Sequence, residues 1–188
     1  MALRTIIATD NFNRGDGGLG ANWTDTADEG STPSIVSNQV TSSGGLDAAA
    51  FWNAHSFNND QYSQITITDA GGDFCGPVVR ANTTDFVFGQ ENGTNVKIYW
   101  YNGGAYTEVA SAAYSVQNND VLRLEAIGTT FSLYVNDVLK ASGSNASAPA
   151  SGKPGLNVSS TGKLDNFEGG NFGIAFDAAS NLLLMGVG

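Results

Sequence analysis

The amino-acid sequence predicts an all-β protein built as two antiparallel sheets packed face to face. Apolar and polar residues alternate along several short segments, which is the pattern of half-buried strands. Turns rich in Gly and Asn separate these segments. Charged residues make up 14% of the chain, against roughly a quarter in most globular proteins, so the charged polar faces typical of helices are missing. The length of 188 residues fits one well-cored domain.

The first half of the chain contains one long alternating segment and several short ones. Residues 60–68 place Ile65 and Ile67 on one face of a strand and Gln64 and Thr66 on the other. Shorter apolar segments, each bounded by turn residues, predict further strands at 35–40, 49–52, 74–80 and 85–88. This spacing is typical of a sandwich of many short strands.

The second half contains two predicted hairpins. The first joins residues 95–101 to 106–109 through Asn102–Gly103, with inward residues Val96, Ile98 and Trp100 and outward residues Lys97, Tyr99 and Tyr101. The second joins residues 120–127 to 131–135 through Gly128 and Thr129. Residues 142–152 are expected to form a long surface loop. The last strand, with Leu164, Asn166 and Phe167, is expected to lie near the N-terminal strand.

Residues spread over most of the chain resemble one superfamily. They are Asp10, Phe12, Arg14, Leu19, Gly20 and Trp23, then Asp120–Glu125 with Asn136 and Asp137, then Gly152–Leu156 and Asp165–Phe167. This set resembles the concanavalin A-like lectin/glucanase superfamily, in its laminin-G-like branch. The resemblance implies a jelly-roll sandwich over residues 1–168. That branch is frequent in bacterial surface proteins and in the structural proteins of tailed bacteriophages, and it includes enzymes, sugar binders and scaffolds.

Residues 169–188 form a predicted C-terminal extension with an apolar composition. Its larger apolar side chains are Phe176, Leu182, Leu183, Leu184 and Met185. Apolar side chains of this kind are costly to leave in water. We therefore predict that the extension packs on its own sandwich or on another subunit, where it serves assembly.

Charge and composition exclude several function classes. The net charge is −10 with only 8 basic residues, which argues against binding to nucleic acid. One Cys and one His cannot form a Cys/His metal cluster. No charged segment precedes a long apolar one at the start, and no apolar run is long enough for membrane insertion. We therefore expect synthesis and folding in the cytoplasm.

The sequence predicts that the protein is not an enzyme. Glucanases of the resembled superfamily commonly carry Glu-x-Asp-x-Glu on one strand, which points three carboxylates at one sugar ring. No predicted strand has this array. His55 is a candidate general base, and the plain alternative is a loop histidine beside Trp52 and Phe57.

Two binding sites are candidates, each with a plain structural alternative. Outward Tyr99, Tyr101 and Tyr106, with Lys97 and Asn102, would stack on a glycan and bond its hydroxyl groups. The alternative is ordinary cross-strand pairing of aromatic residues. Calcium would be held by Asp10, Asp16 and Asp165. The alternative is that these aspartates cap turns, and no other cofactor is expected.

The leading functional prediction is a non-catalytic virion structural protein of a tailed bacteriophage, either a capsid decoration or a tail-associated protein. Its partners would be other virion subunits or a second copy of the chain, with adhesion to a cell-surface glycan as a secondary role. The first alternative is a carbohydrate-binding module or lectin at a bacterial cell surface. The second is a degenerate glycoside hydrolase.

Overall fold

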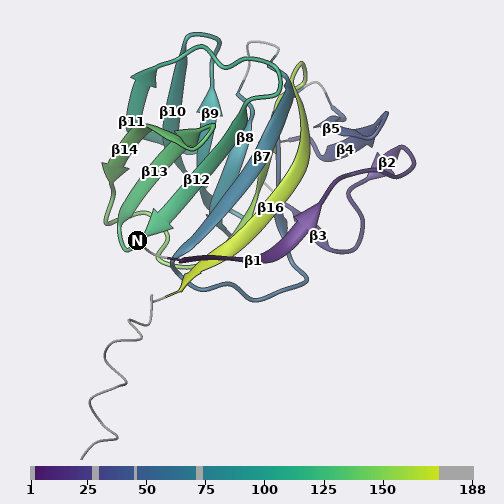
Figure 1. The fold of residues 1–188 in the computed structure, drawn as a ribbon. Helices are drawn as coiled ribbons and strands as arrows, with labels where there is room; N and C mark the ends of the chain where they lie inside the picture. Colours follow the sequence, from purple (N-terminus) through teal and green to yellow (C-terminus); the bar gives the residue numbers. More distant parts are fainter. Residues whose placement is uncertain (1–2, 27–29, 45, 71–73, 174–188) are drawn as a thin grey trace, which may run out of the picture.

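The computed structural model describes residues 3–26, 30–44, 46–70 and 74–173, which form two antiparallel sheets packed face to face (Figure 1). The nine-stranded sheet runs β14 (Val138–Ser144), β13 (Thr130–Val135), β12 (Val121–Ile127), β7 (Gln61–Asp69), β16 (Lys163–Gly173), β5 (Gln39–Ser42), β4 (Pro33–Val36) and β2 (Gly17–Gly18), and β1 (Leu3–Asp10) also pairs with β16. The seven-stranded sheet runs β11 (Ala105–Ala113), β10 (Asn95–Asn102), β9 (Asp85–Glu91), β8 (Gly76–Ala81), β15 (Lys153–Val158), β6 (Ala48–Trp52) and β3 (Trp23–Asp25). The all-β sandwich predicted from the sequence is confirmed. Within this part of the chain, no helix has the length and hydropathy that crossing a membrane requires.

The first and last strands lie side by side in the nine-stranded sheet, as the sequence predicts. Leu3 pairs with Gly173 and Asp10 pairs with Phe167. Strand β16 therefore continues five residues beyond the predicted domain boundary at residue 168. Residues 174–188, which include Phe176 and Leu182–Met185, lie outside the described residues. The assembly role assigned to them stays a prediction.

Both predicted hairpins are present. Strands β12 and β13 pair from Leu122 opposite Val135 to Ile127 opposite Thr130. Strands β10 and β11 meet at a turn where Gly103 and Gly104 both have positive φ, which glycine adopts without strain. The predicted loop at 142–152 is shorter than expected, because β14 runs to Ser144.

The main core lies between the sheets and follows the predicted alternation. Ile65 and Ile67 of β7 are fully buried there, while Gln64 and Thr66 point to the outer face. At one end of the core, the Trp23 ring meets the rings of Trp52 and Phe167 at centroid distances of 5.4 and 4.7 Å. Burying each such side chain contributes about 1.5–3 kcal/mol.

A second apolar cluster covers the outer face of the seven-stranded sheet. Alternation on β9 sends Val87 into the main core and sends Phe86 and Phe88 to the outer face. The cluster comprises Ala49, Phe51, Val78, Ala81, Phe86, Phe88 and Tyr101, with Tyr99 packed against it. This sheet is therefore apolar on both faces, which an ordinary solvent-facing sheet is not.

Candidate functional site

The outer side of the seven-stranded sheet carries a group of aromatic rings, which we call the aromatic face: Phe86, Phe88, Tyr99, Tyr101 and Tyr106. Each ring contacts a neighbouring ring, and together the rings extend across the three adjacent strands β9, β10 and β11. Phe88 lies 5.9 Å from Tyr99 in a stacked arrangement, and Tyr106 lies 4.9 Å from Tyr101 and 6.4 Å from Tyr99. These contacts fix the ring orientations, so the face is preorganised.

A pocket of about 290 Å³ opens beside this aromatic face, lined by Asp47, Phe74, Gln90, Tyr99 and Tyr106. We call it the tyrosine pocket. Tyr106 is 54% exposed and Phe74 is 38% exposed, so two aromatic rings reach solvent there. The backbone carbonyl of Phe74 accepts a hydrogen bond of 2.7 Å from the Asn157 side chain, which anchors this residue over the sheet. The pocket thus combines aromatic rings with one carboxylate and one amide.

An ion pair orients the Tyr99 ring from the side. Lys97 Nζ donates to Glu108 Oε2 at 2.9 Å and to the Tyr99 hydroxyl at 3.1 Å, and that hydroxyl also lies 3.1 Å from Glu108 Oε2. The hydrogen bond from Lys97 lowers the pKa of Glu108, and the bond to Glu108 raises the pKa of Lys97. The positive charge of Lys97 is therefore neutralised by the carboxylate of Glu108.

The five residues predicted for glycan binding do not all lie at this pocket. Tyr99 and Tyr106 line it, and Lys97 positions Tyr99. Tyr101 faces outward as predicted, but it is only 4% exposed because neighbouring rings cover it. Asn102 is exposed at the end of β10 and is not among the lining residues.

The sequence reasoning missed Asp47, Phe74 and Gln90. Gln90 alternates with Phe86 and Phe88 along β9, so the period of two already places it on their face. Asp47 and Phe74 precede β6 and β8, and only the tertiary fold brings them to this pocket.

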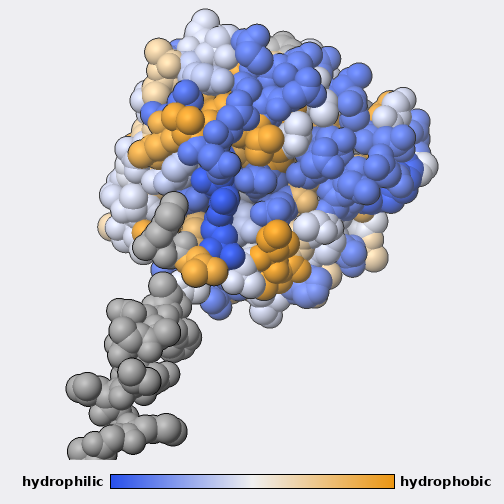
Figure 2. Space-filling model, viewed as in Figure 1, coloured by the Kyte–Doolittle hydropathy of each residue, from blue (hydrophilic) through white to orange (hydrophobic). Residues whose placement is uncertain are grey.

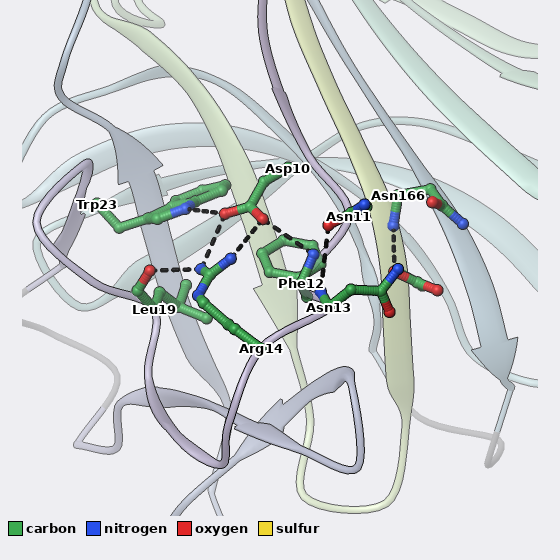
Figure 3. A network of polar contacts seen from close by, with 9 residues as sticks. Asp10, Asn11, Phe12, Asn13, Arg14, Leu19, Trp23 and Asn166 are labelled. Atoms are coloured by element: carbon green, nitrogen blue, oxygen red, sulfur yellow. Dashed lines mark hydrogen bonds and ion pairs between the residues drawn. The ribbon is translucent and has the colours of Figure 1, made fainter.

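In the described residues, the three aspartates predicted as metal ligands accept hydrogen bonds from nearby protein groups. Asp10 accepts hydrogen bonds from Arg14, from the Trp23 indole at 2.9 Å and from the Phe12 backbone at 2.9 Å (Figure 3). Arg14 also donates to the Leu19 carbonyl at 2.6 Å. Burial favours the protonated form of Asp10, but the hydrogen bonds from Arg14 and Trp23 outweigh it and lower its pKa.

Asp16 and Asp165 likewise take local roles. Asp16 accepts from the Ser37 backbone at 2.9 Å, and Asp165 accepts from the Asn166 backbone at 2.7 Å. Burial raises the pKa of Asp165, and the nearby negative charge of Asp10 adds to that rise. Among the described residues, no three His, Cys, Asp or Glu side chains gather as a metal site. Calcium binding stays a prediction.

His55 also has a structural partner. The Trp52 indole donates to His55 Nδ1 at 2.9 Å, and the two rings are stacked with an interplanar angle of 7°. A neutral imidazole that accepts at Nδ1 carries its proton on the other ring nitrogen. The lone pair that a general base would use is therefore on Nδ1, where it already accepts a hydrogen bond from Trp52.

Comparison with known proteins identifies the fold. No family model and no curated protein matches the chain by sequence. The carbohydrate-binding module CBM66 from Bacillus subtilis matches with a TM-score of 0.63 at 19% identity, over 81% of this chain and 98% of that one. The exoplasmic/lumenal domain of VIP36, bound to Ca²⁺ and Man3GlcNAc, matches with a TM-score of 0.60 at 9% identity, over 88% of this chain and 90% of that one.

A third structure is similar over almost its whole length. A variant of LamA from Z. galactanivorans, in complex with laminaritriose and laminaritetraose, matches with a TM-score of 0.56 at 8% identity, over 89% of this chain and 99% of that one. All three are covered almost over their full length, so the likeness extends to the whole sandwich. The chain therefore has the two-sheet jelly-roll fold that these structures share, which is the fold that the sequence resemblance implied.

Proposed function

We propose that this protein is a non-catalytic carbohydrate-binding module that holds a neutral glycan in the tyrosine pocket. The observation that carries the proposal is the convergence of Tyr99, Tyr106 and Phe74 with Asp47 and Gln90 around one open pocket of about 290 Å³. Pockets of this kind combine an apolar surface with a few convergent polar groups that fix the orientation of the ligand.

The lining residues match the chemistry of a sugar. An aromatic ring packs against the C–H face of a pyranose, while a carboxylate and an amide bond its hydroxyl groups. Tyr106 offers the most exposed ring, and Asp47 and Gln90 supply the polar groups. Lys97 is paired with Glu108, so the site lacks a cation directed at an acidic sugar, which favours a neutral one.

The comparisons support a carbohydrate as the class of ligand. The similar structures include a carbohydrate-binding module, a domain bound to Man3GlcNAc and a protein bound to laminari-oligosaccharides. The non-catalytic reading is supported by the strand sequences, because no described strand carries the Glu-x-Asp-x-Glu array. A site of action outside the cell or on its surface follows from a glycan partner.

The virion role predicted from the sequence has no separate support in the described residues. It was expected from the family resemblance, the lack of a catalytic carboxylate array and of an export signal, the acidic charge and the apolar C-terminal extension, and that extension lies outside the described residues. It stays a prediction, and it is compatible with glycan adhesion by the tyrosine pocket.

Affinity electrophoresis in gels containing mannan or laminarin tests the proposal. We expect the wild-type protein to be retarded and Tyr106→Ala to lose at least about fivefold in affinity, because a central aromatic contact is worth more than about 1 kcal/mol. Tyr106→Phe is the matched control, since it keeps the ring and removes only the hydroxyl. Equal retardation of wild type and Tyr106→Ala would exclude the tyrosine pocket as the site.

A further inference from the structure

A second pocket opens on the opposite side of the molecule, on the outer face of the nine-stranded sheet. It measures about 480 Å³ and is lined chiefly by Thr9, Asn11, Gln64, Thr66, Asn166 and Glu168. We call it the amide pocket. Figure 2 views this face and shows a band of hydrophilic side chains crossing it between apolar patches.

An irregularity in β16 shapes the pocket. Asp165 pairs with Thr66 and Glu168 pairs with Gln64, so two residues of β16 stand opposite one residue of β7. This is a β-bulge, which re-aims side chains. Asn166 adopts φ 53° within the bulge, and Phe167 turns into the core, where it is 2% exposed. Figure 3 shows the Asn166 side chain pointing away from the Asp10 network.

The bulge gathers side-chain amides from three segments of the chain. Asn11 follows β1, Gln64 belongs to β7 and Asn166 belongs to β16. Each amide can donate and accept hydrogen bonds. Within the described residues, the side-chain amides of Gln64 and Asn166 make no hydrogen bond to the protein, so they are available to a ligand in the pocket that they line.

The charged groups at this pocket argue against an ionic ligand. Asp10 is engaged by Arg14, Trp23 and Phe12, and Glu168 accepts a hydrogen bond of 2.8 Å from the Tyr62 hydroxyl. A bound cation would compete with these donors for the carboxylate oxygens. No Lys or Arg is among the lining residues, and two carboxylates would repel an anion. Amides and hydroxyls remain, and they suit a neutral ligand rich in hydroxyl groups.

We propose that the amide pocket is a second saccharide-binding site, which recognises a neutral sugar by hydrogen bonds instead of by aromatic stacking. The two pockets lie on the outer faces of opposite sheets. One molecule therefore contacts two glycan chains, or two parts of a branched one. Simultaneous binding raises the apparent affinity for a polysaccharide above that for either short sugar alone.

A ¹⁵N-resolved NMR titration with mannotriose and with laminaritriose tests the second site on the intact chain. We expect one set of shifted amide signals around Gln64, Thr66 and Asn166, and a separate set around Gln90 and Tyr99. Gln64→Ala and Asn166→Gly should each weaken sugar binding at the amide pocket, measured from the first set of signals, by about tenfold. This is the effect of losing one or two hydrogen bonds. Glycine suits the left-handed backbone of residue 166.

Two controls separate this proposal from the tyrosine pocket. Asn38→Gly removes an amide from another left-handed position, φ 63°, in the β4–β5 turn away from the pocket, and it should leave both sets unchanged. Tyr106→Ala should abolish only the set around Gln90 and Tyr99. Shifts confined to the aromatic face with both sugars would overturn the second site alone. Shifts confined to Gln64 and Asn166 would overturn the tyrosine pocket alone, and the absence of both sets would overturn both.

Discussion

Asp10 organises the turn that follows β1 through hydrogen bonds from three different residues. Its two oxygens accept from the Arg14 guanidinium, the Trp23 indole and the Phe12 backbone. The Asp10 side chain is only 10% exposed, so these donors cannot all turn to water when the carboxylate is removed. The residues that carry the family resemblance near the start of the chain therefore have a structural role.

We expect Asp10→Asn to lower the free energy of unfolding by about 2 kcal/mol, because hydrogen bonds to a charged group contribute about 1.5–3 kcal/mol. Urea denaturation measures this change. Asp16→Asn is the control, since Asp16 is exposed and accepts a hydrogen bond from the Ser37 backbone, and it should cost less than about 1 kcal/mol. Equal losses in both variants would contradict the role assigned to Asp10.

The pH dependence of stability follows from the same network. The folded-state pKa of Asp10 is lowered, whereas its unfolded-state pKa is about 3.9. The stability that Asp10 contributes is thus fully present above about pH 4 and is lost as the pH falls through the folded-state pKa. Urea midpoints measured on both sides of this window should differ more for the wild type than for Asp10→Asn. A parallel decline in the two proteins would show that Asp10 is not the group responsible.

At the scale of elements, the packing of β15 between β6 and β8 depends on glycine at a position that alternation cannot identify. A Cβ added to Gly155 would lie 2.0 Å from the Ala50 carbonyl oxygen and 2.8 Å from the Phe51 Cα. Both obstacles are backbone atoms, so the strands would have to separate. The outer face of the seven-stranded sheet would move with them.

Gly155→Ala should therefore destabilise the protein by about 2 kcal/mol or more, as overpacking in a well-filled interior typically does. Gly18→Ala is the matched control, because Gly18 has nothing within 4 Å of an added Cβ and does not have positive φ. Thermal unfolding of both variants provides the comparison. A stable Gly155→Ala protein would mean that β15 and β6 are not packed this closely.

The alternation of apolar residues predicted most of the strands, and for a clear reason. On β7 and β12, one face is buried in the core, so the period of two appears directly in the sequence. It was less informative on β6 and β8, where every residue is buried because both faces are covered. The β16 bulge was not foreseen, since one extra residue shifts the register without a composition signal.

The candidate site could be predicted only in part. Tyr99 and Tyr106 were found because a hairpin makes them neighbours. Asp47 and Phe74 come from segments distant in sequence, and their approach depends on the sandwich topology. The burial of Tyr101 was missed because alternation gives the side of a sheet that a residue faces, and it does not say whether neighbouring rings cover that side.

At the scale of the whole molecule, the net charge of −10 should select among glycans. A strongly negative protein repels polyanions at low ionic strength, and this repulsion is screened by salt. We expect no binding to an acidic polysaccharide such as alginate, and an affinity for a neutral glycan that changes less than about threefold between roughly 0.05 and 0.5 M salt. Binding to alginate that weakens with added salt would instead point to a cationic site.

The central claim is that the tyrosine pocket holds a sugar, and a crystal structure of the protein with mannotriose or laminaritriose tests it most directly. We predict a pyranose ring packed on Tyr106, with its hydroxyl groups bonded to Asp47 and Gln90. A complex in which a bound saccharide leaves the tyrosine pocket empty would contradict the claim.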